Sequence, residues 1–84
     1  MNKSVETIIK ELFGDVYIIS VSDAPKTSDW PECTVVQIIH ENCWKDIWLN
    51  GTELQKTVKA REDVLSDAEM VIWQDLCDKG IVKK

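Results

Sequence analysis

Two neighbouring segments rich in β-branched and aromatic residues constrain the fold of this chain most. Cys33–His40 and Trp44–Leu49 have the composition of strands, and the short connection Glu41-Asn42-Cys43 predicts an antiparallel hairpin. Side chains alternate between the two sides of the first strand. One side carries Thr34, Val36, Ile38 and His40, and the other carries Cys33, Val35, Gln37 and Ile39. Both sides are largely apolar. We therefore expect a second sheet face that short helices do not cover fully.

The N-terminal segment has the pattern of an amphipathic helix. Asn2 or Ser4 can cap it, and Gly14 can end it in the left-handed conformation. Its apolar residues share one side, namely Val5, Ile8, Ile9, Leu12 and Phe13.

A second amphipathic helix is predicted near the C-terminus. Ser66-Asp67-Ala68-Glu69 matches a capping box, and Gly80 supplies a stop after Lys79. The apolar arc of this helix holds Met70, Ile72, Trp73, Leu76 and Cys77.

The two remaining stretches differ in how clearly they can be read. Val16–Val21 is predicted to be a strand, and Ser22–Glu32, which holds two prolines, a loop. Thr52 with Gln55 resembles a capping box, and Leu54 and Val58 lie four apart, so we favour a helix after Gly51. Asn50-Gly51 is equally a hairpin signal, which would make Thr52–Val58 a fourth strand.

These elements predict a single α+β domain spanning residues 1–84. The expected order is α-β-β-β-α-α. A two-layer arrangement, in which a three-stranded antiparallel sheet has its helices packed on one face, is the simplest solution.

Composition points to a protein of the cytoplasm. The chain has no apolar run of the roughly 18 residues that a membrane span needs, and its N-terminus lacks the pattern of a signal peptide. Its three cysteines form no disulfide framework, which suggests reduced thiols. The net charge of −5 repels phosphate backbones, so the expected partner is a protein with a basic surface and not nucleic acid.

The residues offer little for catalysis or metal binding. His40 is the only histidine, and no phosphate loop, nucleophile motif or paired-carboxylate motif is present. Cys33, His40 and two further cysteines have the types of a zinc site, but Cys33 and His40 are seven apart and point to opposite faces of a regular strand. We expect no enzyme, no cofactor and no metal.

Candidate partner-binding residues fall into two groups. Acidic residues form the first: Asp67, Asp75 and Asp78 on the C-terminal helix, Glu62 and Asp63 just before it, and Asp29 and Glu32 in the loop. Such a row is either a solvated helix face or a mimic of phosphate spacing. Three tryptophans form the second group. Trp30 is either an exposed anchor or folded back over the sheet, and Trp44 with Trp48 is either core or an aromatic pair on an open face.

The leading hypothesis is a small acidic inhibitor of a larger basic, nucleic-acid-binding protein. Phages and mobile elements use such proteins against host defences, acting in the host cytoplasm. The expected element order is similar to that of a family of short, acidic Cas9 inhibitors, a likeness of architecture that carries no residue roles. The alternative is a homo-oligomeric structural or adaptor protein that pairs through its tryptophan-bearing sheet face, so the chain is expected to be a monomer or a homodimer. A nucleic-acid-binding module using Lys56, Lys59, Arg61 and the Lys83-Lys84 tail is opposed by the net charge.

Overall fold

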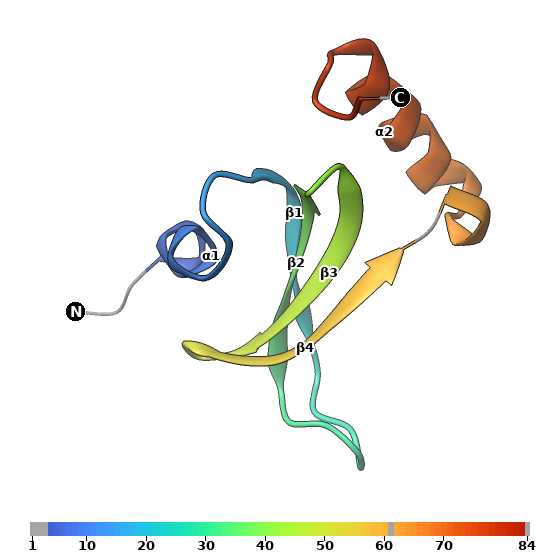
Figure 1. The fold of residues 1–84 in the computed structure, drawn as a ribbon. Coiled ribbons are helices and arrows are strands. Elements are labelled where there is room, and N and C mark those ends of the chain that lie inside the picture. Colours follow the sequence, from blue (N-terminus) through green and yellow to red (C-terminus); the bar gives the residue numbers. More distant parts are fainter. Residues whose placement is uncertain (1–3, 61, 84) are drawn as a thin grey trace.

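A computed structural model describes residues 4–60 and 62–83 of the chain. Helix α1 precedes four strands, and a short 3-10 segment, η1, leads from the last strand into helix α2 (Figure 1). The elements are α1 (Val5–Phe13), β1 (Tyr17–Ala24), β2 (Cys33–His40), β3 (Cys43–Asn50), β4 (Glu53–Ala60), η1 (Glu62–Val64) and α2 (Asp67–Asp78).

The four strands form one antiparallel sheet in the order β1-β2-β3-β4, so each strand pairs with its neighbours along the chain. The predicted hairpin is confirmed: β2 begins at Cys33 and ends at His40, and His40 pairs with Cys43. Glu41 and Asn42 form its turn with positive φ angles of 53° and 63°, as a type I′ turn requires. The strand predicted at Val16–Val21 is also present, but it continues to Ala24.

The predicted helix after Gly51 is wrong, because this segment is the fourth strand. Asn50 pairs with Glu53 around the two-residue turn Gly51-Thr52. Only Gly51 of these two has a positive φ, 62°, as in a type II′ turn. The spacing of Leu54 and Val58 suggested one helix face, yet the two lie on opposite sides of the sheet because a bulge interrupts β3 and β4. The hairpin signal therefore outweighed helix propensity.

The predicted N-terminal and C-terminal helices both form, and each has its expected N-terminal cap. The Ser4 hydroxyl accepts from the Thr7 N–H; Asn2, the other candidate cap, lies outside the described residues. Gly14 ends α1 with a φ of 80°, but its ψ of −147° places it outside the left-handed helical conformation that was expected. Ser66 and Glu69 complete a reciprocal capping box at the start of α2.

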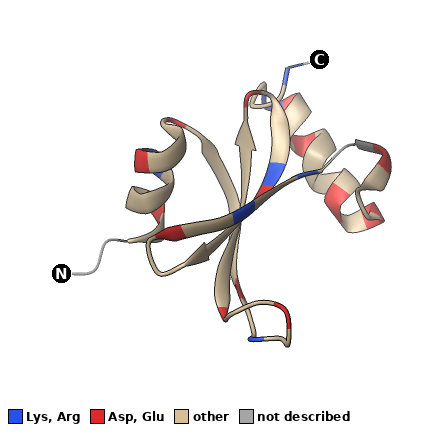
Figure 2. Ribbon diagram, turned by 60° about the horizontal axis from the view of Figure 1, so that its bottom comes forward, with Lys and Arg blue, Asp and Glu red and all other residues tan. Residues whose placement is uncertain are grey.

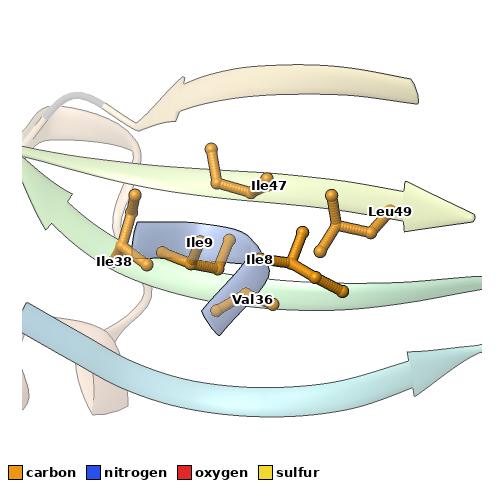
Figure 3. Close-up of a cluster of buried hydrophobic side chains, with 6 residues drawn as sticks. All are labelled: Ile8, Ile9, Val36, Ile38, Ile47 and Leu49. Carbon is orange, nitrogen blue, oxygen red and sulfur yellow. The ribbon is translucent and has the colours of Figure 1, made fainter. Parts of the chain in front are cut away.

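The helices cover opposite faces of the sheet, so the expectation that they pack on one face is wrong. Helix α1 packs on one face through a cluster of buried side chains from the helix, β2 and β3 (Figure 3): Ile8, Ile9, Val36, Ile38, Ile47 and Leu49. Helix α2 lies on the other side (Figure 1) and buries a second cluster: Ile39, Trp44, Leu76 and Val82. Because both faces of β2 and β3 are apolar, each face requires its own helix.

Helix α2 covers only the part of its face that lies near the β2–β3 turn. Its cluster uses Ile39, Trp44 and Ala60, which are register partners at that end of the sheet. Toward the other end, the same face carries Trp48 and Lys56, which pair across β3 and β4. We call this second part the open half-face. It is the partly uncovered surface that the alternation of β2 indicated.

Candidate functional site

The four tryptophans occupy three different environments. Trp44 is fully buried, at 0% exposure, so it belongs to the core. Trp73 packs against the same cluster from α2, and its indole N–H is buried with no hydrogen-bond partner among the described residues. Trp30 and Trp48 are only half-buried. Trp73 is half-buried as well, so Trp30 and Trp48 differ from it in lying outside the α2 cluster.

Trp30 and Trp48 meet at one lysine on the open half-face. The Lys56 ammonium lies 4.3 Å from the centroid of the Trp48 ring and 4.7 Å from that of Trp30. Both distances are within the range of cation–π attraction. Trp30, which the sequence left as either an exposed anchor or a residue folded back, is thus folded back toward β3 and β4. We call the Trp30 and Trp48 rings the tryptophan clamp.

A short turn fixes the position of Trp30 in the β1–β2 loop. The Thr27 hydroxyl accepts from the N–H groups of Asp29 and Trp30, at 3.3 and 3.0 Å. The Thr27 N–H in turn donates to the Trp30 carbonyl at 2.9 Å. These local bonds replace the sheet pairing that the loop lacks, so the Trp30 backbone is held without a regular element.

Asp46 lies between the two tryptophans of β3 and on the same face as both. Its Oδ1 accepts from Trp44 Nε1 at 3.2 Å. Burial raises the pKa of the Asp46 carboxyl above its usual range, and hydrogen bonds from Trp44 and Gln37 oppose the rise only in part. Within residues 4–60 and 62–83, no Lys or Arg forms an ion pair with Asp46. The open half-face therefore holds a carboxylate that burial disfavours and that no described cation offsets.

The predicted acidic arc is present on α2 and is exposed. Asp67, Asp75 and Asp78 all face solvent. Asp75 forms an ion pair with Lys79 at 2.8 Å, and this hydrogen bond raises the pKa of Lys79. Asp78 accepts a hydrogen bond from Gln74 at 3.1 Å.

The acidic surface extends into η1. Asp63 is exposed and already interacts within the chain, and the side chain of Glu62 lies outside the part that the structure describes. Residues 62–78 contain six Asp or Glu and no Lys or Arg. Lysines instead lie along β3 and β4, whereas acidic residues recur over η1 and α2 (Figure 2). The charge of the molecule is thus unevenly divided between its elements.

The acidic residues of the β1–β2 loop lie elsewhere. Asp29 and Glu32 are exposed, and they flank the clamp residue Trp30 in sequence. Glu32 also lines a surface pocket of about 270 Å³ at the end of the sheet farthest from α2, where the walls are Asp23, Glu32, Cys33, Thr34, Leu49, Asn50 and Gly51. The structure therefore does not bring the loop carboxylates and the α2 carboxylates together into one acidic patch.

The residues considered for zinc are dispersed. Cys33 is buried and donates to the Pro31 carbonyl, while His40 packs edge-on against Phe13 on the α1 side, with ring centroids 5.2 Å apart. Among the described residues, no group of three or more His, Cys, Asp or Glu has the geometry to hold a metal ion.

Sequence reasoning missed two residues of the open half-face, Lys56 and Asp46. Lys56 entered only as a possible nucleic-acid contact, and Asp46 was not among the candidate residues. If residues 53–60 are taken as a strand, Lys56, Val58 and Ala60 share one face. That face is the one that carries the tryptophans of β3, because Lys56 pairs with Trp48 and Ala60 with Trp44. The Asn50-Gly51 turn was the signal that could have found it.

Comparisons with protein-family models, curated proteins and solved structures return no match to this chain. Neither α1 nor α2, the helices of the described residues, has the length and apolar content needed to cross a bilayer.

Proposed function

We propose that this protein is a non-enzymatic binding protein whose acidic η1–α2 surface binds a basic surface on a larger protein. The observation that carries the proposal is the run of six carboxylate residues over 62–78 without one Lys or Arg. The run carries six negative charges against a net charge of −5 for the whole chain, so negative charge is concentrated over η1 and α2, where Lys79 pairs with one of the six, Asp75. Charges of this kind steer a basic partner and set the orientation of the complex.

The arrangement of side chains on α2 supports a docking role. Asp67, Val71 and Asp75 follow each other at intervals of four residues, so they share one helix face. Val71 is 71% exposed among these carboxylates. An apolar side chain within an acidic face supplies contact area that simple solvation of the helix does not require.

In its narrower form, the proposal makes the partner a nucleic-acid-binding defence protein and this chain an inhibitor of the anti-CRISPR type. The architectural likeness to Cas9 inhibitors no longer supports that form, because it depended on three strands followed by two helices. The acidic charge is its remaining support: carboxylates occupying a phosphate-binding groove would exclude nucleic acid by charge alone.

A charge-reversal variant tests the proposal. Asp67→Lys, Asp75→Lys and Asp78→Lys together should abolish capture of the partner in a pull-down from cell lysate at low salt. The matched control reverses three exposed carboxylates of other elements, Asp15→Lys, Asp23→Lys and Glu53→Lys, and alters the net charge equally. Equal capture by the two variants would overturn the proposal, provided that circular dichroism shows both to be folded.

Self-association through the open half-face is a second candidate. Val58 is 42% exposed there beside the half-buried Trp48, so a two-fold pairing of these faces would bury apolar area. Trp44 is buried within one chain and would not contribute. Light scattering at low and high salt separates the candidates, because a dimer whose mass is independent of salt favours the sheet face.

A further inference from the structure

The tryptophan clamp is a cation site that one of the protein's own residues already occupies. Lys56 reaches it from β4, while the two rings come from β3 and from the β1–β2 loop. The electron-rich faces of two indoles select for positive charge whatever group carries it. Lys56 has no ion-pair partner among the described residues, so the rings are the main attraction that holds its ammonium.

A guanidinium suits such a site better than an ammonium does. It is planar, so it can stack on an indole, and it is more weakly hydrated than the ammonium of lysine. Arginine is also the cation that is most often found over tryptophan rings. An arginine supplied from outside would therefore compete with Lys56 for the same two rings.

Asp46 provides an anion next to this site. It precedes Trp48 by two residues on β3 and faces the same way, about 7 Å along the strand. Its carboxyl has the pKa raised by burial, as described above, and no cation among the described residues is paired with it. The fork of N–H donors on a guanidinium can reach a carboxylate while its plane stays on a neighbouring ring.

The charge around the loop also favours a cationic ligand. Asp29 and Glu32 lie on either side of Trp30 in sequence, and both are exposed. These two carboxylates outnumber the one lysine of the loop, Lys26, so the loop carries net negative charge, and Asp46 adds a carboxylate on the sheet.

We propose that the tryptophan clamp binds an arginine side chain of the basic partner, which displaces Lys56, stacks on the indoles and pairs with Asp46. This inference rests on the proposed function in one respect, the basic character of the partner. It adds a second contact, on the open half-face, to the acidic surface of α2. Lys56 acts as an internal competitor that weak ligands do not displace.

The test uses nona-arginine as the probe, with nona-lysine for comparison, and tryptophan fluorescence as the readout at moderate salt. Lys56→Gln and Lys59→Gln remove the same charge, but Lys59 lies on the α1 side of β4, where it pairs with Lys45. Lys56→Gln is expected to bind nona-arginine roughly two- to fivefold more tightly than Lys59→Gln does. Trp30→Ala is expected to lose the preference for arginine over lysine.

The outcomes separate this inference from the proposed function. Equal affinities of Lys56→Gln and Lys59→Gln would overturn the clamp, as would an unchanged arginine preference in Trp30→Ala. In either case the α2 proposal stands if the triple reversal at Asp67, Asp75 and Asp78 still abolishes partner capture. Conversely, if both clamp variants give the expected result while the triple reversal on α2 leaves capture unchanged, the basic partner binds the sheet face and not α2. Near-UV circular dichroism checks that each variant is folded.

Discussion

Asn42 binds the backbone of Lys83 through both polar atoms of its side-chain amide. Its Nδ2 donates to the Lys83 carbonyl, and its Oδ1 accepts from the Lys83 N–H at 2.6 Å, although the two residues are 41 positions apart. The segment after α2 is thereby tied to the β2–β3 turn. Val82, next to it, is buried against Ile39 and Trp44 in the α2 cluster.

Replacing Asn42 with glycine should reveal the strength of this tie. Glycine accepts the positive φ of 63° at this position, so the backbone of the turn is not strained and only the two side-chain hydrogen bonds are lost. We expect Asn42→Gly to lower the free energy of unfolding by about 1 kcal/mol, as measured by urea titration. A variant as stable as the parent would show that the bonds to Lys83 contribute nothing in water.

Glu41, in the same turn, allows an opposite prediction. It has a φ of 53°, which is uncommon for residues other than glycine, asparagine, aspartate and histidine. Its ion pair with Lys45 spans 3.7 Å, and the Glu41 side chain is 74% exposed, so water screens the pair and its contribution is small. Glu41→Asn should therefore raise the free energy of unfolding by up to about 1 kcal/mol. A loss of stability in the same urea titration would mean that the pair with Lys45 outweighs the strain.

The raised pKa of Asp46 predicts a pH dependence with a definite sign. The folded state binds this proton at a higher pH than the unfolded state does. At pH values above the raised pKa, the ionised carboxyl therefore lowers the free energy of unfolding. As pH falls through that raised value toward the ordinary 3.8, its contribution to stability improves. Asp46→Asn should be at least as stable as the parent at pH 7, since the Asn carbonyl can still accept from Trp44.

Thermal unfolding of the parent and of Asp46→Asn across pH 3 to 7 isolates this group from the other carboxylates. The stability difference between the two proteins should shrink as pH falls. A difference that grows on acidification would contradict the burial argument.

Gly51→Ala tests the turn between β3 and β4, after which the chain forms a strand and not the expected helix. The space around Gly51 is open, so an added Cβ meets no atom within 4 Å and the effect comes from the backbone alone. A φ of 62° disfavours alanine, and we expect a loss of about 1–2 kcal/mol in the free energy of unfolding. A gain in the free energy of unfolding, measured by urea titration, would contradict the positive φ of Gly51 and with it this turn.

The elements whose pattern and end signals agreed were predictable from sequence. Helix α2 has both a capping box at Ser66 and a stop at Gly80, and the turn at Glu41 follows eight residues of strand composition. Residues 53–60 were mispredicted because a four-residue spacing and good helix formers pointed one way while Asn50-Gly51 pointed the other. Local propensity could not decide between them, since a strand here is stabilised by pairing with β3.

The candidate site was only partly accessible to sequence reasoning. Charge along α2 is a local property, so its acidic face could be read directly from the helical period. The meeting of Trp30 with Trp48 and Lys56 depends on how a loop of eight residues folds back over the sheet, which no local pattern specifies. The side of the sheet that each helix covers is likewise set by the direction of the chain before β1 and after β4 and not by composition.

With one helix on each side of a single sheet, the protein has two small cores that share β2 and β3 as a common wall. Detaching α1 exposes Ile9 but leaves Leu76 in place, and detaching α2 does the reverse. Partial opening can therefore remain confined to one side while the central hairpin stays ordered. Such an arrangement lets α2 adjust to a bound protein without melting the remainder of the molecule.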